Sequence, residues 1–535
     1  MDTKLLLPHQ KIDAEIDLEF RNIGSLFQKR TKQSPNKIFL ISPGKREDVF
    51  SYQDFLNSFL NVARYLSDLG LKKGDRINLI IPTSPEFLLM FFAALTIGIT
   101  VVPINPDLAP REILYIITDS QSKVAFYDIA FENKIKQISE YIPNNVQSIS
   151  LNPLPDFEPL LKKSEIHQKK TISTDLNLTD EAVIIYTSGT SGHPKGAVLS
   201  HLNLLSDAKA ISEWFKFSEQ TRTMCILPLF HNNGQVVTLL APLYGGGTTI
   251  IVKGKVSLMS FWGLVHKYRI NWSSVMASML SILLSLPAER RDNTMQGIIC
   301  GGQVLTESVQ DSFEKRFNVP IFEGYGLTET TSFSCFNDFP EDRRRKGSIG
   351  KALPINDMTI MDEKGNELGP NVDGEICIRG FNVTKGYLGL SERNKTAFHN
   401  GWFHSGDYGY KDEDGYFYFK GRKDALIIKG GENIYPSELE NVIFQHPSVA
   451  ECAVIGIPDR LLGEDIVAYV KLKKGFQTTE VELREFCKGK IAYFKQAKKI
   501  IIIDELEDLY EIPKGPTKKI LYRKLKEYYL SHELK

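Results

Sequence analysis

Hydroxyl groups, glycines and one lysine are concentrated in residues 186–196, which read YTSGTSGHPKG. Backbone N–H groups, Ser and Thr hydroxyls and an ammonium group in one short loop suit a polyphosphate, because all of them donate hydrogen bonds to phosphate oxygens. The spacing differs from that of a Walker A loop, since Lys195 lies between Pro194 and Gly196. The segment therefore predicts phosphate binding of another kind, with an ordinary Gly/Ser/Thr turn as the alternative.

Three further polar residues stand in contexts that suit binding or catalysis. Glu329 lies in a turn-like segment after Gly326, where a carboxylate could hold Mg²⁺ while the metal bridges phosphates. Asp407, within SGDYG, suits a bidentate hold on ribose hydroxyls, and an exposed turn is its alternative. His231 follows the apolar residues 226–230 and precedes NNG; taken alone, a histidine of this kind is more often structural.

The overall composition excludes several classes of protein. The 65 basic and 65 acidic side chains give no net charge, so we expect no nucleic-acid partner. With 42% hydrophobic and 24% charged residues, the chain is typical of a globular protein. The six cysteines never form a C-x-x-C pair, which indicates reduced thiols in the core. The N-terminal residues resemble neither a secretory nor a transit signal, and together these features predict a cytoplasmic protein.

One apolar stretch, residues 87–104, has 18 residues without a charge and is at the lower limit for a membrane span. Ser84 suits a helix cap, Pro85 the first helical position, and Gly98 a helix end. The remaining residues, 99–102, are mostly β-branched and stop at a proline. We therefore predict a buried helix of about 13 residues followed by a buried strand, without stable membrane insertion.

Predicted strands and helices alternate through the first four hundred residues. Residues 76–81 and 248–252 read as strands, and residues 258–268 as an amphipathic helix, which favours an α/β architecture with parallel sheets. Residues 332–350 carry an acidic and then basic run that predicts a solvated loop. Short strands separated by D-G and K-G turns then indicate a β-rich subdomain at about 350–420.

A new α/β unit begins beyond residue 422. We expect a helix near residue 436, strands at 451–457, 467–472 and 499–503, a helix from about residue 479, and a lysine-rich helix from about residue 518. The sequence shows no internal repeat or low-complexity tract.

Five motifs together resemble the adenylate-forming superfamily, which contains acyl-CoA synthetases, peptide-synthetase adenylation domains and firefly luciferase. In chain order they are residues 186–196, PLFH at 228–231, YGLTE at 325–329, SGD at 405–407, and GRKD at 421–424 running on to PSELE at 436–440. The likeness extends from about residue 20 to 526. It implies a large N-terminal domain of two α/β subdomains plus a β-rich subdomain, residues 1–421, a hinge at 422–426, and a small mobile α+β domain at 427–535.

The resemblance also implies residue roles. Thr328 would donate to the ATP α-phosphate, Tyr325 would pack on adenine, Asp407 and Arg422 would hold the ribose, and His231 would stand at the carboxylate tunnel. Metal binding would fall to Glu329 and Thr187, and catalysis to Lys519, His231, Thr328 and Lys195. The full set implied for ATP and AMP is Thr187, Ser188, Gly189, Thr190, Ser191, Gly192, Lys195, Gly301, Gly302, Gln303, Glu323, Gly324, Tyr325, Gly326, Thr328, Asp407, Arg422 and Lys519.

Near the C-terminus, related sequences read Thr-Gly-Lys where this chain reads Thr-Lys518-Lys519. By resemblance Lys519 reaches the substrate carboxylate and the α-phosphate during adenylation, although Lys518 in place of the usual glycine leaves open which lysine inserts. Asp424 matches the hinge residue about which the C-terminal domain swings. Lys429, Gly430 and Gly431 would then line a tunnel for the pantetheine of coenzyme A.

The implied reaction is ATP-dependent activation of a carboxylic acid as acyl-AMP, with Mg²⁺, followed by transfer of the acyl group to coenzyme A. A fatty acid of medium or long chain is expected and an aryl acid is the alternative. The segments expected to form the walls of the acid tunnel contain no arginine, which argues against a dicarboxylate; they are residues 230–235, 276–280, 301–304 and 330–335. Two other readings stay open: an acyl-AMP ligase that loads a phosphopantetheine carrier protein, and an inactive nucleotide-binding scaffold. Neither the identity of the acid nor the oligomeric state follows from the sequence.

Overall fold

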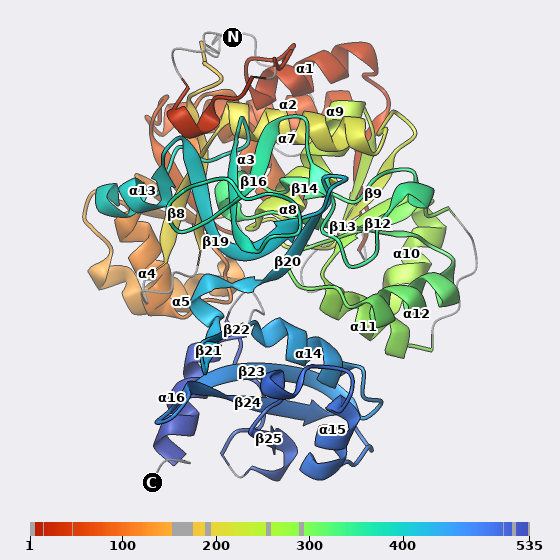
Figure 1. Cartoon of the computed structure of the whole chain (residues 1–535). Coiled ribbons are helices and arrows are strands. Elements are labelled where there is room, and N and C mark those ends of the chain that lie inside the picture. The colour runs from red at the N-terminus through yellow and green to blue at the C-terminus, as the bar shows by residue number, and fades with distance from the viewer. Residues whose placement is uncertain are drawn as a thin grey trace. The chain divides into compact units, whose positions relative to one another are not determined.

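The computed structural model divides the chain into two units, residues 1–358 with 378–404 and residues 359–377 with 405–535 (Figure 1). The structure describes residues 6–13, 15–44, 47–151, 175–187, 194–252, 258–287, 294–506, 508–515 and 520–532. Strands and helices alternate through the first unit, and most of its strand pairs are parallel, which confirms the predicted α/β class.

A six-stranded sheet in the first unit has the order β6-β5-β3-β4-β7-β8. All its pairs are parallel except β7 with β8, which form an antiparallel hairpin. Alternate residues of β3 enter two different apolar clusters, Ile77 and Leu79 on one face and Ile80 on the other, so both faces are buried. The strands are β3 (Arg76–Ile80), β4 (Thr100–Pro103), β5 (Val124–Tyr127), β6 (Gln147–Ser150), β7 (Glu181–Thr187) and β8 (Lys195–Ser200).

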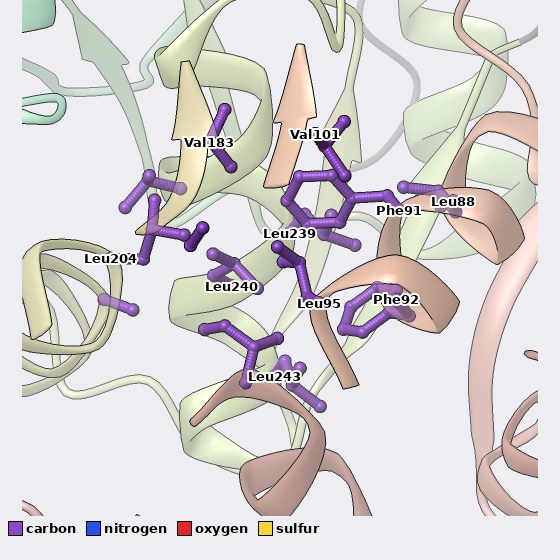
Figure 2. Packing of buried hydrophobic residues seen from close by; sticks show 14 of the residues in the cluster. Leu88, Phe91, Phe92, Leu95, Val101, Val183, Leu204, Leu239, Leu240 and Leu243 are labelled. Carbon is purple, nitrogen blue, oxygen red and sulfur yellow. The ribbon is translucent and has the colours of Figure 1, made fainter. Parts of the chain in front are cut away.

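The apolar stretch that could have been a membrane span forms α3 (Pro85–Thr96), followed by β4. Ser84 caps the helix, since its Oγ accepts a 3.2 Å hydrogen bond from the N–H of Phe87. Figure 2 shows Leu88, Phe91, Phe92 and Leu95 of α3 among buried side chains of other elements, which include Val101, Val183 and Leu239. The prediction of a buried helix and strand is confirmed, and no helix in the described ranges is long and apolar enough to cross a membrane.

A nine-stranded sheet completes the first unit, in the order β15-β14-β13-β12-β11-β9-β10-β1-β2. One face of this sheet packs on three helices, α10 (Phe261–Tyr268), α11 (Ala277–Ser285) and α12 (Glu307–Phe317). The contacts include Val265, Leu280 and Phe313, one from each helix. The other face joins the large core that also contains α3 and α7. The strands are β1 (Ile38–Ser42), β2 (Asp48–Ser51), β9 (Arg222–Cys225), β10 (Thr248–Ile251), β11 (Trp272–Val275), β12 (Gly297–Cys300), β13 (Ile321–Tyr325), β14 (Cys335–Phe336) and β15 (Lys351–Ala352).

Helices of the first unit are of ordinary length for a globular protein. The segment after His231 is unusual, because α8 runs directly into a π-helical turn at Val236–Leu240 and then into α9. The helices are α1 (Ile23–Gln33), α2 (Tyr52–Asp68), α4 (Pro110–Asp119), α5 (Glu132–Ile138), α7 (His201–Trp214), α8 (Asn232–Gln235), α9 (Ala241–Gly245), α10 (Phe261–Tyr268), α11 (Ala277–Ser285), α12 (Glu307–Phe317) and α13 (Ser391–Ala397).

Short strands dominate the region predicted to be β-rich. They are β16 (Asn356–Met361), β17 (Gly374–Gly380), β18 (Phe398–His399), β19 (Trp402–Lys411) and β20 (Phe417–Arg422), and they form one five-stranded sheet. The division between the two units falls within β16, β17 and β19. The D-G turn predicted between the last two strands is present, with Gly415 at a φ of 83°.

The C-terminal part of the second unit has a sheet of order β22-β21-β24-β23, with β25 parallel to β24. The predicted elements are present, although the last helix begins later than expected, and residues 516–519 lie outside the described ranges. The elements are β21 (Ile427–Lys429), β22 (Glu432–Ile434), α14 (Pro436–Phe444), β23 (Val449–Asp459), β24 (Gly463–Leu472), α15 (Glu480–Cys487), β25 (Lys499–Ile502) and α16 (Tyr522–His532).

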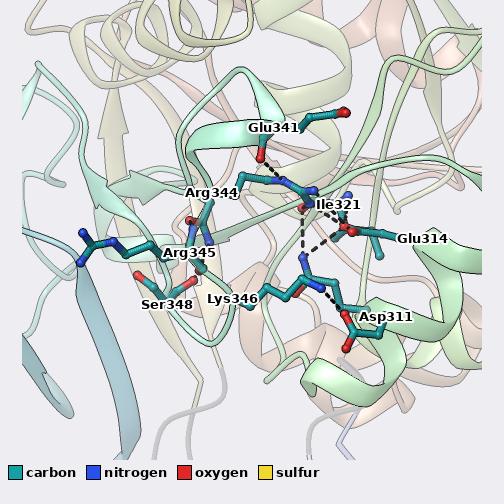
Figure 3. A network of polar contacts seen from close by, with 10 residues as sticks. Asp311, Glu314, Ile321, Glu341, Arg344, Arg345, Lys346 and Ser348 are labelled. Carbon is teal, nitrogen blue, oxygen red and sulfur yellow. Dashed lines mark hydrogen bonds and ion pairs between the residues drawn. The ribbon is translucent and has the colours of Figure 1, made fainter.

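The prediction of a solvated loop at residues 332–350 holds for most of its charged run, since Glu341, Asp342, Arg343 and Lys346 are exposed, but not for the two ends of the range, which are buried. Cys335 and Phe336 form β14, and two residues of the charged run, Arg344 and Lys346, pair with side chains of α12 (Figure 3). Arg344 forms a mostly buried ion pair with Glu314, donates to the backbone oxygen of Ile321, and lies 5.2 Å from the ring centroid of Phe322. Lys346 pairs with Asp311 of the same helix. The partners of Arg344 and Lys346 come from a helix about thirty residues earlier in the chain, and the run of charges alone does not reveal these contacts.

Candidate active site

The predicted phosphate loop connects β7 to β8. Thr187 ends β7 and lies opposite Lys195, the first residue of β8, in the antiparallel register of this hairpin. The five loop residues of the prediction lie outside the described residues: Ser188, Gly189, Thr190, Ser191 and Gly192. The hairpin base is anchored by Tyr186, whose hydroxyl donates a 2.6 Å hydrogen bond to Asp119. Thr187, a predicted metal ligand, and Lys195, a predicted phosphate contact, are therefore neighbours at the two ends of the loop.

A second segment, residues 381–388, runs beside β8. The backbone N–H of Val198 donates to the oxygen of Gly386 at 2.9 Å, and the N–H of Leu388 donates to the oxygen of Gly196 at 2.8 Å. This pairing places the ring of Tyr387 5.5 Å from the ammonium nitrogen of Lys195, a cation–π distance.

The same tyrosine contacts the predicted metal ligand. The Tyr387 hydroxyl donates a 2.7 Å hydrogen bond to Oε1 of Glu329, and the N–H of Thr384 donates to the backbone oxygen of Glu329 at 2.8 Å. Glu329 is half-buried in the single 3₁₀ turn Thr328–Thr330. None of the described lysines or arginines forms an ion pair with it. Carboxylate oxygens are common ligands of Mg²⁺, and Glu329, with one oxygen bonded to Tyr387 and no ion pair among the described residues, fits this role.

Three predicted nucleotide-binding glycines occupy positions where no larger residue fits. A Cβ at Gly301 would lie 2.5 Å from the ring of Phe333, and one at Gly324 would lie 2.4 Å from the ring of Phe336. At Gly326 a Cβ would lie only 1.8 Å from the backbone oxygen of Ser332. These glycines thus let the end of β13 and the turn after β12 pack directly on residues 332–336.

Glu323 is buried within β13, one residue before that glycine cluster. Burial raises the pKa of its carboxyl group to about 8, opposed by a hydrogen bond from the backbone N–H of Leu305. The group is therefore largely protonated at neutral pH and ties β13 to the 301–305 turn. Gln303, in this turn, accepts a 3.1 Å hydrogen bond from the N–H of Ser278, and Gly302 has a φ of 79°.

His231 stands at the N-terminal end of α8, half-buried, with its ring 4.7 Å from that of Phe230. The residues that follow carry polar atoms that are buried: Nδ2 of Asn232, Oδ1 of Asn233 and Oε1 of Gln235. In the part of the chain that the structure describes, these three atoms have no hydrogen-bond partner. Such atoms are costly unless water or a ligand satisfies them, which makes this end of α8 a candidate substrate contact.

In the second unit, Asp407 of β19 lies directly opposite Arg422 of β20. Nη1 of Arg422 is 2.9 Å from Oδ1 of Asp407; the aspartate side chain is 4% exposed and the arginine side chain 44%. The alternative of an exposed turn at Asp407 is wrong, because the residue lies in the middle of a ten-residue strand. The strand pairing explains how residues fifteen positions apart share one site.

The predicted coenzyme A residues form a tight hairpin between β21 and β22. Lys429 pairs with Glu432, and the two residues between them, Gly430 and Gly431, have φ values of 62° and 89°. A two-residue hairpin with both φ values positive requires glycine-like residues, so this turn alone explains the Gly-Gly pair. The ammonium of Lys429 lies 2.7 Å from Oδ1 of Asp465, in an ion pair whose side chains are 15% and 8% exposed.

The remaining predicted residues are less defined. Lys519 and Lys518 lie outside the described residues, between Lys514 and Ile520, which pair as an antiparallel bridge. Asp424 is in the 3₁₀ turn Lys423–Ala425 that connects β20 to β21. Sequence reasoning missed Tyr387 altogether. Its only sequence signal is its position in a short Gly-Tyr-Leu segment after a strand, and that pattern does not reveal a contact with residues 195 and 329.

Comparison with known proteins defines the family. Residues 27–388 match the AMP-binding enzyme family, and residues 438–509 match the AMP-binding enzyme C-terminal domain. The chain therefore belongs to the AMP-binding enzyme family of adenylate-forming CoA ligases, as the five motifs predicted.

Relatives with different acid substrates are similar to this chain. An oxalate–CoA ligase of Arabidopsis thaliana is 34% identical over 476 residues, 88% of this chain and 91% of that protein. A long-chain-fatty-acid–CoA ligase of Mycobacterium tuberculosis is 31% identical over 515 residues, 95% of this chain and 99% of that protein. A sulfoacetate–CoA ligase of Cupriavidus necator is 29% identical and covers 95% and 97% of the two chains.

Solved structures show the same fold. ATP-bound MatB from Rhodopseudomonas palustris superposes with a TM-score of 0.85 at 29% identity, covering 95% of this chain and 99% of that one. The o-succinylbenzoate CoA synthetase of Bacillus subtilis, in complex with its acyl-adenylate intermediate, gives 0.83 at 28% identity, with coverage of 95% and 99%. These matches confirm the predicted large N-terminal and small C-terminal domains.

Proposed function

We propose that this protein is an AMP-forming acid–thiol ligase that activates a carboxylic acid with ATP and passes the acyl group to coenzyme A. The observation that carries the proposal is the convergence of Lys195 and Glu329 on Tyr387. A cation and a carboxylate that could hold a metal, brought together beside a phosphate-type loop, suit the handling of a nucleoside triphosphate.

In the first step, a carboxylate oxygen of the acid attacks the α-phosphorus of ATP. A bond from acyl oxygen to phosphorus forms, and the bond from phosphorus to the bridging oxygen of pyrophosphate breaks. Lys195 and Thr328 would stabilise the negative charge that develops on the phosphate oxygens, and Lys519 would bring the two anions together. Mg²⁺, when bound by Glu329 with Thr187, would neutralise phosphate charge.

In the second step, the sulfur of a thiol attacks the acyl carbon. A thioester bond forms, AMP leaves with the electron pair of the acyl–oxygen bond, and the thiol proton passes to solvent. Rotation about the segment that contains Asp424 would exchange Lys519 for the Gly430-Gly431 turn between the two steps. A carrier-protein phosphopantetheine is the alternative acceptor to coenzyme A.

For the acid itself, a fatty acid of medium or long chain was expected from the sequence, with an aryl acid as the alternative. The unpartnered polar atoms of Asn232, Asn233 and Gln235 support a different candidate, an acid with a second polar group. Such an acid would satisfy donors and acceptors that an alkyl chain leaves unpaired, and unpaired buried polar groups discriminate strongly against the wrong ligand.

Pyrophosphate release tests the proposal. The purified protein with Mg²⁺ and ATP is given aliphatic, aromatic, dicarboxylic and hydroxy- or amino-substituted acids, with and without coenzyme A. Acid-dependent release with formation of acyl-CoA supports the ligase. Acid-dependent release without acyl-CoA favours the carrier-loading alternative, and preference for simple fatty acids contradicts the polar-acid candidate. No release with any acid class contradicts the ligase proposal and favours the scaffold.

A further inference from the structure

A strained turn follows Glu329. Thr331 has φ 68° and ψ −64°, and the N–H of Ser332 donates a 2.8 Å hydrogen bond to the oxygen of Thr330. These angles and this i to i+2 bond define a γ-turn of the form that is rare in proteins. A β-branched residue such as threonine is disfavoured at positive φ, so something must hold the turn in place.

The side chain and backbone of Asn382 surround this turn. Oγ1 of Thr331 donates a 2.6 Å hydrogen bond to the backbone oxygen of Asn382. In return, Nδ2 of Asn382 donates to the oxygens of Thr330 at 3.2 Å and Phe333 at 3.0 Å. The side chain is fully buried, so these bonds form away from water, where an unmade bond is expensive. Asn382 therefore contacts the strained residue Thr331, the residue before it and the residue two positions after it.

Asn382 is itself held by elements distant in sequence. Nδ2 of Asn203, in α7, donates to the backbone oxygens of its two neighbours, Phe381 at 2.7 Å and Val383 at 2.8 Å. Gln10, near the N-terminus, also donates to the oxygen of Val383 at 2.8 Å. The N–H of Thr384, two residues after Asn382, donates to the backbone oxygen of Glu329. The turn is thus fastened to a segment that is fixed from both sides.

We propose that Asn382 is a positioning residue for Glu329: by holding Thr331 in its strained γ-turn, it sets the direction in which the Glu329 carboxylate points. This inference rests on the proposed function, because it assumes that Glu329 holds Mg²⁺ for ATP. The role proposed for Asn382 is indirect, because its side chain donates hydrogen bonds to the backbone around Thr331. Residues of this kind orient a metal ligand from outside, and their loss costs metal affinity.

The test compares Asn382→Ala with Asn356→Ala. Asn356 is also buried and donates through Nδ2 to the oxygen of Ser334, just past the turn, so it is a matched control with the same chemistry. Calorimetry gives the ATP dissociation constant of each variant in EDTA and in Mg²⁺, and the ratio of the EDTA value to the Mg²⁺ value isolates the metal's contribution. We expect Asn382→Ala to lower this ratio about tenfold. Both variants should lower the thermal unfolding midpoint, but Asn356→Ala should leave the ratio unchanged.

A second-site change tests the strain itself. Glycine adopts positive φ without steric cost, so Thr331→Gly should need no external restraint. In the double variant Asn382→Ala/Thr331→Gly, the ratio should return to within about threefold of the wild-type ratio. Two substitutions that act independently would not compensate each other in this way. Should Asn382→Ala not fold, Asn382→Ser, which keeps one donor, serves in the same comparison.

Two results would overturn the inference alone: an equal ratio in Asn382→Ala and the wild type, or an equal loss in the Asn382 and Asn356 variants. Strictly additive effects of Thr331→Gly and Asn382→Ala would also count against it. A wild-type protein that binds no ATP under any condition would instead overturn the proposed function, and this inference with it.

Discussion

The hydroxyl of Tyr387 donates a 2.7 Å hydrogen bond to Oε1 of Glu329. The same ring lies 5.5 Å from the ammonium nitrogen of Lys195, so one aromatic side chain contacts both candidate phosphate-site charges. Pairing of residues 385–388 with β8 brings the tyrosine there from almost two hundred residues along the chain. Tyr387 thus orients the carboxylate and leaves its second oxygen for another ligand.

Replacing Tyr387 by Phe should weaken metal dependence more than stability. The ring and its contact with Lys195 stay, but Glu329 loses the hydrogen bond that fixes its orientation. We expect the Mg²⁺ concentration for half-maximal pyrophosphate release to rise about tenfold. Tyr52→Phe is the control, because its buried hydroxyl donates a 2.8 Å bond to Gly247 in another part of the first unit. Equal Mg²⁺ dependence in both variants would show that Tyr387 acts only through stability.

Much of the fold could be predicted from the sequence because its signals are local. The strand at 76–81, the capped helix after Ser84 and the alternation of strands and helices depend on neighbouring residues, and each is present. The glycines of the nucleotide motifs follow from the resemblance to the adenylate-forming superfamily. The structure adds the reason at Gly326, where the oxygen of Ser332 leaves no room for a side chain.

What the sequence missed depends on partners far apart in the chain. Tyr387 reaches the candidate site through pairing of its segment with β8, and Arg344 is half-buried because it pairs with Glu314 of a distant helix. The role of Lys429, Gly430 and Gly431 in coenzyme A binding, implied by the family resemblance, stays a prediction; the structure adds that the two glycines complete a hairpin and that Lys429 pairs with Asp465. Tertiary pairing of this kind overrides local pattern and leaves little trace in it.

Because Glu323 keeps its proton in the folded chain, the free energy of unfolding should fall as the pH rises. The folded-state pKa is about 8 and the ordinary value is 4.5, so between these values the folded chain keeps a proton that the unfolded chain has released. The free energy of unfolding therefore decreases across this window, and the loss is complete above about pH 8. Glu323→Gln has no proton to lose. Its unfolding free energy should exceed that of the wild type increasingly from pH 5 to 8, by up to a few kcal/mol.

Urea unfolding of both proteins at pH 5, 6.5 and 8 measures this difference in unfolding free energy. The other titrating groups are the same in both proteins, so their contributions cancel in the difference. Glu392→Gln, at an exposed position on α13, serves as the control and should follow the wild type at every pH. A constant difference between Glu323→Gln and the wild type would contradict burial of a protonated carboxyl group.

Two glycines of the candidate site should respond very differently to alanine. At Gly326 a Cβ would meet the backbone oxygen of Ser332 at 1.8 Å, so the chain must move, at a cost of about 3 kcal/mol or more. At Gly302 no atom lies within 4 Å of the Cβ position, and only its φ of 79° opposes the change, which costs about 1 kcal/mol. Thermal unfolding of the two variants should reproduce this order, and equal midpoints would refute the close approach.

Separate assays of the two half-reactions should distinguish the role of Lys519 from that of Lys518. If Lys519 brings carboxylate and α-phosphate together, Lys519→Ala should reduce acyl-AMP formation at least a hundredfold, because two anions must then approach without its charge. Thioester formation from synthetic acyl-AMP and coenzyme A should be nearly unchanged, since the acid is already activated in that step. Lys518→Ala, the adjacent control, should keep both half-reactions within about threefold of the wild type. The reverse pattern would assign adenylation to Lys518, and equal loss of both half-reactions in Lys519→Ala would show that this lysine supports the fold and not the chemistry.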